Sequence, residues 1–153
     1  MTTKRKRILS VAVASGKVAY IFLIDGRLKD WQCSRAASLS APKGRSLLRR
    51  AVARFEPDLV VTEDPFKPTR KSGSSLEILN ALVQELTDSA TPHHLVQRNQ
   101  QFANKYDEAK VLAKRFPAIT PWLPKTPKIW EAEPVNAIYF EALSMAVQIE
   151  DDG

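Results

Sequence analysis

The chain has a single cysteine, Cys33, and no apolar run near the roughly 20 residues of a bilayer span. One cysteine cannot form a disulfide within the chain, which fits a reducing compartment, and we expect the protein in the cytoplasm. Without a membrane-spanning run, we expect no membrane partner. These two absences argue against a disulfide-stapled secreted domain and against an integral membrane protein.

Glycine is also scarce, with five residues in the whole sequence. Neither G-x-G-x-x-G nor G-x-x-x-x-G-K-[ST] occurs, which excludes the sequence signatures of a Rossmann dinucleotide site and of a P-loop. The turn between the first two apolar runs contains only Gly16, and no second phosphate-binding hairpin follows. We therefore expect no nucleotide cofactor.

Positive charge, by contrast, is in excess: 23 Lys and Arg face 17 Asp and Glu, for a formal charge of +6. The 153 residues, 44% hydrophobic and 26% charged, suit one globular domain over residues 1–153. A basic surface raises the local concentration of polyanions, which favours nucleic acid as a partner. Solvated surface charge is the simpler explanation that remains open.

Local patterns predict the elements of an α/β fold. Turn signals at Ser15-Gly16 and Asp25-Gly26 separate three β-rich runs, and a short, fully apolar run after Pro57 is typical of a strand buried on both faces. Apolar residues at helical spacing indicate the helices, and the prolines of residues 116–130 indicate irregular structure. The predicted strands are residues 8–14, 18–24, 27–34, 59–62 and 93–99, and the predicted helices are 41–55, 75–88, 100–115 and a last one from near Pro134.

This order predicts a mixed sheet, in which three antiparallel strands are followed by alternating helices and strands, flanked by helices. Acidic residues fall at two places where such a sheet can build a site. Glu63 and Asp64 directly follow the buried strand, and Glu131 and Glu133 precede the last helix. Both pairs also have structural explanations, because acids are favoured at helix N-termini and a polar pair can end a strand.

Three stretches, in this order, resemble the ribonuclease H-like superfamily and, within it, the RuvC-type Holliday-junction resolvases. "ILSVAVASGKVAY" runs without a gap along that family's first strand and hairpin, whose pattern is I-L-G-I-D-P-G-S. "VVTEDPF" is similar to the fourth strand, which ends in a glutamate often followed shortly by Phe. "EAEPVNAIYFEALSMA" is similar to the final helix, which begins with D-x-x-D. The resemblance implies a ribonuclease H-like mixed sheet.

The resemblance also implies roles for individual residues. Glu63 falls on the metal ligand of strand four, and Glu133 and Asn136 fall on the two acids of D-x-x-D. Ala12 falls on the first-strand aspartate, which in this superfamily lies between two divalent metals. The implied cofactor of an active site is Mg²⁺ or Mn²⁺, but here an alanine and an amide replace two of its acids.

That replacement matters because two-metal hydrolysis holds its cations about 3.5–4 Å apart with several anionic oxygen ligands. Two candidate carboxylates remain where the pattern has four, so an active site needs a substitute acid. Glu131, at the helix entrance, is the most plausible substitute. Asp64 points to the opposite face of the strand from Glu63, and Glu141 lies about 12 Å beyond Glu133 along the helix.

Cations near these acids are candidates for contacts with phosphates. Lys67, Arg70 and Lys71 occupy the loop after Glu63, separated by proline, threonine and serine. Lys105 and Lys110 lie on a helix that the resemblance places near the same cleft. A solvated loop without a ligand is the alternative explanation.

Three hypotheses for function follow. The leading one is a nucleic-acid-binding RuvC-like protein, with branched or duplex DNA as partner, whose two-metal nuclease site is degenerate at Ala12. The second is an active Mg²⁺- or Mn²⁺-dependent structure-specific DNA endonuclease that uses Glu63, Glu133 and a substitute acid. The third is a non-catalytic scaffold or partner-binding domain. A homodimer is compatible with each.

Overall fold

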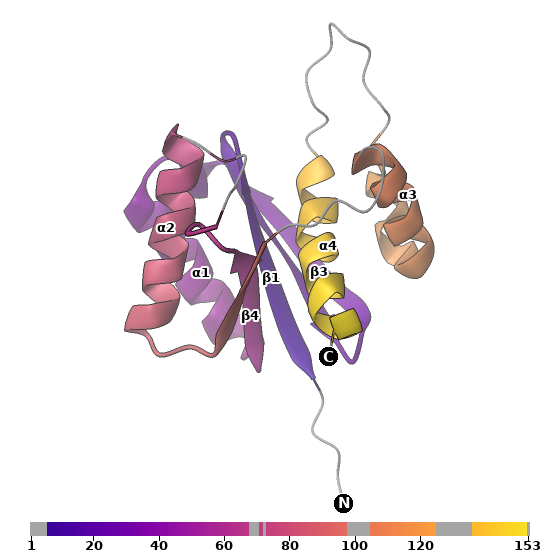
Figure 1. Cartoon of the computed structure of the whole chain (residues 1–153), viewed down its shortest axis with the longest axis horizontal. Helices are drawn as coiled ribbons and strands as arrows, with labels where there is room; N and C mark the ends of the chain where they lie inside the picture. Colours follow the sequence, from indigo (N-terminus) through magenta and orange to yellow (C-terminus); the bar gives the residue numbers. More distant parts are fainter. Residues whose placement is uncertain (1–5, 68–70, 72, 98–104, 125–135, 153) are drawn as a thin grey trace, which may run out of the picture.

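The computed structural model describes residues 6–67, 71, 73–97, 105–124 and 136–152. Its strands and α-helices alternate in the order expected from the sequence (Figure 1). The strands are β1 Arg7–Ala14, β2 Lys17–Ile24, β3 Arg27–Ser34, β4 Leu59–Glu63 and β5 His93–Val96. The α-helices are α1 Ala41–Phe55, α2 Gly73–Asp88, α3 Lys105–Arg115 and α4 Ala137–Asp152.

In the described part of the chain, these strands form one mixed sheet in the order β3-β2-β1-β4-β5. The hairpin strands β1 and β2 pair antiparallel over their full length, as do β2 and β3 with one irregularity in register. β1 pairs parallel with β4, and β4 pairs parallel with β5. β1 is therefore the central strand, and its carboxyl end and that of β4 reach the same edge of the sheet.

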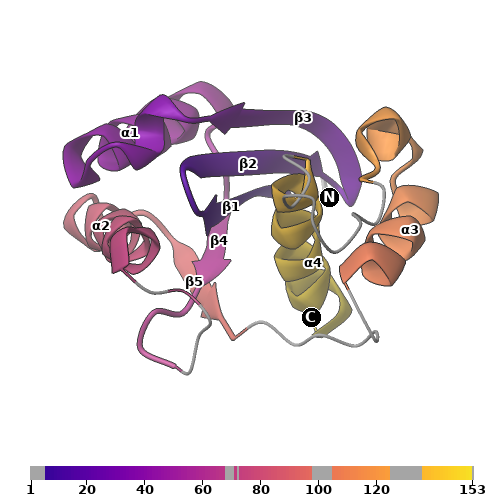
Figure 2. The same cartoon turned by 90° about the horizontal axis from the view of Figure 1, so that it is seen from above.

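Helices cover both faces of the sheet (Figure 2). On one face α1 and α2 bury the odd-numbered side chains of β1, including Leu9 and Val13. On the other face α4 packs against the even-numbered side chains Ile8 and Ala12, and α3 contacts α4. This alternation is the period of a strand that is buried on both faces, which explains why the run is apolar throughout.

The ends of α1 follow from local chemistry. The side chain of Ser40 accepts a hydrogen bond from the backbone N–H of Lys43, and Pro42 lies in the first turn, where its missing N–H costs nothing. At the other end Glu56 adopts a left-handed conformation with φ of 46° and stops the helix. The chain then turns directly into β4.

The predicted fold class is confirmed, and the strands and helices lie within a few residues of their expected bounds. Part of the predicted irregular segment forms a 3-10 helix, Pro117–Trp122, because a proline suits the start of such a turn. The last helix begins at Ala137 in the described residues, and residues 98–104 and 125–135 lie outside them. Within the described chain, no helix combines the length and the apolar character needed to cross a bilayer.

Candidate functional site

The acid that follows the buried strand lies at the carboxyl end of β4. Glu63 is the last residue of β4 and only 6% exposed. Val61, two residues earlier, packs in the core between the sheet and α4. Because side chains two residues apart on a strand share a face, Glu63 also points toward α4. In Figure 1 the carboxyl end of β1, which is parallel to β4, and the N-terminal end of α4 both lie at the top of the molecule.

A lysine from the next loop joins this glutamate to α4. Nζ of Lys71 lies 2.8 Å from Oε1 of Glu141, in the second turn of α4, and 3.7 Å from Oε1 of Glu63. The three side chains are 13%, 14% and 8% exposed, in the order Lys71, Glu141, Glu63. A strand, a helix and a loop thus bring two carboxylates and one ammonium group together; we call these three residues the carboxylate–lysine cluster.

The neighbouring position on β1 carries no oxygen ligand. β1 and β4 are in register with Ser10 opposite Val61, and continuing this register by two residues places Ala12 level with Glu63. Ala12 is 1% exposed and belongs to the core on the α4 side. The wall of the cluster that faces β1 is therefore a methyl group.

In the described part of the chain, the donor set does not fit a pair of divalent cations. Mg²⁺ and Mn²⁺ need several hard oxygen ligands, yet the cluster offers two carboxylates, and a lysine is already bound to them. Oδ1 of Asp64 accepts a hydrogen bond from the backbone N–H of Phe66, which closes a turn. The described residues contain no group of three His, Cys, Asp or Glu that could hold a metal ion.

The structure describes only some of the other predicted site residues, and none of those described belongs to the carboxylate–lysine cluster. Glu131, Glu133 and Arg70 are outside the described residues. Asn136 lies in the turn before α4, where its backbone carbonyl accepts a hydrogen bond from the N–H of Tyr139. For the helix α3, Lys105 is its first residue, with a side chain outside the described part, and Lys110 is exposed.

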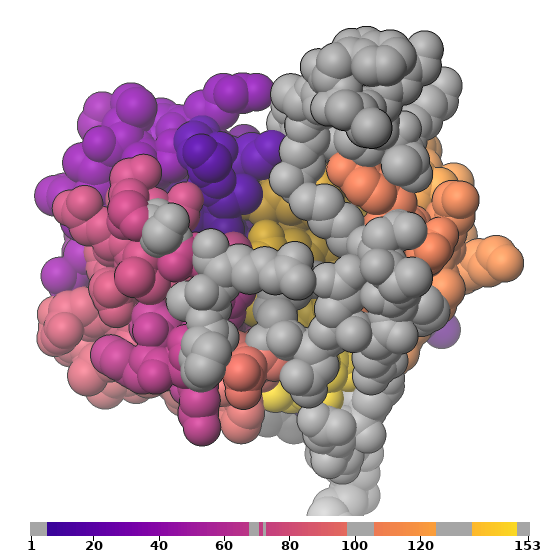
Figure 3. Space-filling view, turned by 45° about the horizontal axis from the view of Figure 1, so that its top comes forward, coloured from indigo at the N-terminus to yellow at the C-terminus, as the bar shows by residue number. Residues whose placement is uncertain are grey.

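The loop after β4 presents two side chains to solvent. The ring of Phe66 is 77% exposed, which makes it one of the most exposed large apolar residues of the described chain. Lys67 follows it and is exposed as well. Figure 3 turns this end of the molecule forward and shows α4 (yellow) between the side of α2 and the side of α3. An aromatic ring and a cation are therefore exposed to solvent three and four residues after Glu63.

Sequence reasoning missed the part that Glu141 plays here. Its distance from Glu133 along the helix set it aside, but α4 crosses the sheet so that its second turn lies near Glu63, with Lys71 between them. Lys71 was expected to face nucleic acid from the loop, whereas its ammonium group points inward to the two carboxylates. The one available signal was an acid among the apolar residues of the helix face that packs on the sheet.

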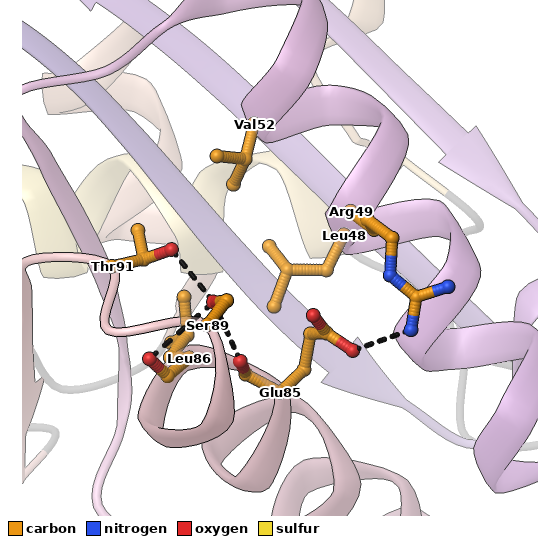
Figure 4. Close-up of a pocket in the computed structure, with 7 residues that line it drawn as sticks. All are labelled: Leu48, Arg49, Val52, Glu85, Leu86, Ser89 and Thr91. Carbon is orange, nitrogen blue, oxygen red and sulfur yellow. Dashed lines mark hydrogen bonds and ion pairs between the residues drawn. The ribbon is translucent and has the colours of Figure 1, made fainter.

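A second cluster of charges lies on the opposite face, in a small cavity between α1 and α2 (Figure 4). Glu85 is 6% exposed there and accepts hydrogen bonds from Arg45 and Arg49. The hydrogen bond from Arg49 lowers the pKa of Glu85 most, burial opposes this, and the bond from Arg45 lowers it further. With both arginines engaged and a volume of about 50 Å³, the cavity is a helix–helix contact rather than a ligand pocket.

The remaining reactive side chains have structural roles. Nδ1 of His93 lies 2.7 Å from the backbone oxygen of Thr91, at the start of β5. Burial raises the pKa of the Cys33 thiol, although Lys17 and Arg35 oppose it, so the thiolate that a nucleophile requires is disfavoured. Neither residue contributes to the carboxylate–lysine cluster.

The arrangement of sheet and helices is the ribonuclease H-like fold of RuvC-type Holliday-junction resolvases. Thermus thermophilus RuvC matches with a TM-score of 0.60 and 12% identity, over 95% of this chain and 96% of that one. The same RuvC in complex with a Holliday junction gives 0.61 and 13%, over 96% of each chain. Fowlpox virus resolvase, solved with Holliday-junction DNA, gives 0.58 and 15%, over 95% of this chain and 97% of that one. No protein-family model matches the sequence, and no curated protein does.

Proposed function

We propose that this protein binds branched or duplex DNA at the end of the molecule that carries Glu63, and that it does not cut DNA by two-metal hydrolysis. Support for binding comes from the fold, which extends over nearly the whole chain and is shared with resolvases solved with Holliday-junction DNA. The net charge of +6 favours a polyanionic partner. We place the protein in the cytoplasm.

The observation that carries this proposal is the exposed pair Phe66 and Lys67, three and four residues after the buried Glu63. A lysine contributes a phosphate contact, and an exposed aromatic ring offers a surface on which a base can stack. Both functions tolerate any base sequence, so we expect recognition of DNA structure rather than of sequence.

The residue Ala12 supports the proposal that this protein does not cut DNA. A metal bound between β1 and β4 would supply an activated water and stabilise the leaving oxygen, with Glu63, Glu133 and Glu131 as its candidate ligands. The methyl group of Ala12 offers no oxygen where the superfamily has an aspartate, and Asn136 offers a neutral amide. We therefore assign Glu63 and Asn136 to a former nuclease site and DNA contact to Lys67, Arg70, Lys105 and Lys110.

A gel experiment tests both parts. Labelled four-way junction and plain duplex are incubated with the protein in EDTA, Mg²⁺ or Mn²⁺, beside Glu63→Gln, Lys67→Gln and, as a control, Lys6→Gln. Lys6 is an exposed lysine directly before β1, at the edge of the sheet opposite to Glu63, and its loss changes the net charge equally. We expect a shift in EDTA that weakens with salt, no cleavage, and a weaker shift for Lys67→Gln than for Lys6→Gln.

Metal-dependent cleavage that disappears in Glu63→Gln would instead establish an active endonuclease with a substitute acid. Absence of any shift at low salt would contradict DNA binding and favour a scaffold. A homodimer belongs to the same proposal, because a four-way junction is two-fold symmetric and a symmetric dimer matches it. Sedimentation of the protein with and without junction measures that state.

A further inference from the structure

The carboxylate–lysine cluster contains a cation that belongs to the chain. Lys71 lies two residues before α2 and reaches across the end of β4 to α4. Its Nζ is at hydrogen-bond distance from Glu141, at 2.8 Å, and within ion-pair distance of Glu63, at 3.7 Å. Three elements that are separate in the sequence supply the three charges.

Burial makes this arrangement different from a surface salt bridge. All three side chains are at most 14% exposed, and a charge that loses its water needs an opposite charge close by. Glu63 and Glu141 face the same ammonium group, and without it the two carboxylates would repel each other across a poorly hydrated gap. The cluster therefore requires a cation between these two residues.

We infer that Lys71 is the resident cation of this site and takes the place that a divalent metal occupies between carboxylates in two-metal nucleases. The inference deepens the proposed function, on which it rests for the assignment of Glu63 to a former metal ligand. Ala12 closes the side facing β1 with a methyl group, so no third carboxylate competes with the lysine there.

An ammonium group and a divalent metal neutralise carboxylates alike but differ in chemistry. Lys71 donates hydrogen bonds to its partners, has no open coordination position, and cannot acidify a bound water. A chelator cannot remove it, because it is part of the chain. The site keeps its shape without Mg²⁺ or Mn²⁺, and those ions gain nothing by entering it.

The test titrates Mn²⁺ into the protein without any nucleic acid and follows free Mn²⁺ by electron paramagnetic resonance. Wild type is compared with Lys71→Gln, with Lys71→Arg, which keeps the cation, and with Lys43→Gln, which removes an exposed lysine elsewhere. We expect no saturable binding to wild type, Lys71→Arg or Lys43→Gln. Lys71→Gln removes the ammonium group that the two carboxylates share, so this variant gains one saturable Mn²⁺ site.

In the double variant Lys71→Gln with Glu141→Gln, this gained binding is lost, because one carboxylate remains. Saturable Mn²⁺ binding by wild type as tight as that of Lys71→Gln would overturn the inference. So would a folded Lys71→Gln, checked by circular dichroism, that binds no Mn²⁺. If Lys71→Gln does not fold, wild type decides: a thermal midpoint equal in Mn²⁺ and EDTA supports the inference, and one raised by Mn²⁺ overturns it.

The outcome is independent of DNA. If wild type does not shift DNA but Lys71→Gln gains a Mn²⁺ site, the proposed DNA binding is refuted and the resident lysine is supported. If wild type shifts DNA and also binds Mn²⁺ as tightly as Lys71→Gln does, the proposed DNA binding is supported and the resident lysine is refuted.

Discussion

Oγ of Ser10 donates a hydrogen bond of 2.7 Å to the backbone oxygen of Ala142, 132 residues later in the chain. Ser10 is two residues before Ala12 on β1, and Ala142 directly follows Glu141 on α4. This bond fixes the height at which α4 crosses the central strand. It therefore places Glu141 opposite the end of β4, where Lys71 joins it to Glu63.

Ser10→Ala removes this bond from a fully buried position. We expect the free energy of unfolding to fall by about 1 kcal/mol, because the carbonyl of Ala142 loses a buried donor. Urea unfolding followed by circular dichroism measures the change. Ser38→Ala is the matched control, since Ser38 makes a hydrogen bond of the same type and length in an exposed position. Equal stability of the two variants would contradict a role for Ser10 in fixing α4.

Glu85→Gln tests the contact between α1 and α2 through its pH dependence. The pKa of Glu85 lies below its ordinary value of 4.5 in the folded chain, mainly because Arg49 donates a hydrogen bond to it. The ionised carboxylate therefore stabilises the fold above about pH 4.5, and this contribution is lost as the pH falls through the folded-state pKa. We expect Glu85→Gln to be about 1 kcal/mol less stable than wild type at pH 7.

The difference between the two proteins should shrink steadily in acid, and urea unfolding at a series of pH values from neutral to 3 measures it. Glu77→Gln, an exposed acid on the same helix, is the control and should stay close to wild type throughout. A deficit of Glu85→Gln that grows toward low pH would show that Glu85 acts in another way.

Phe66→Ala tests the exposed ring of the loop after β4. The ring is 77% exposed, so its removal should leave the stability unchanged. If a base stacks on it, affinity for four-way junction DNA falls about fivefold or more. Leu39→Ala removes a similarly exposed apolar side chain, 71% exposed, in the loop before α1, and should leave affinity as in wild type. Fluorescence anisotropy in EDTA measures both, and equal affinities of the two variants would exclude stacking on Phe66.

Much of the fold could be predicted from the sequence because its signals are local. The turn at Ser15-Gly16 fixes the first hairpin, and Gly16 has the positive φ, 76°, that such a turn favours. Pro42 and the apolar stripe define α1, and a run of apolar residues before Glu63 marks a strand buried on both faces. Each of these signals acts within a few residues, so no knowledge of the rest of the chain is needed.

The sequence by itself determined that an acid ends the buried strand and that alanine stands where the resemblance expects an aspartate on the first one. It could not determine which cation Glu63 meets. Lys71 and Glu141 are 70 residues apart, and their contact depends on how α4 crosses the sheet and on how the loop after β4 returns to α2. Only the packing of α4 on the sheet, together with the path of the loop after β4, decided that a lysine and not the solvent faces these carboxylates.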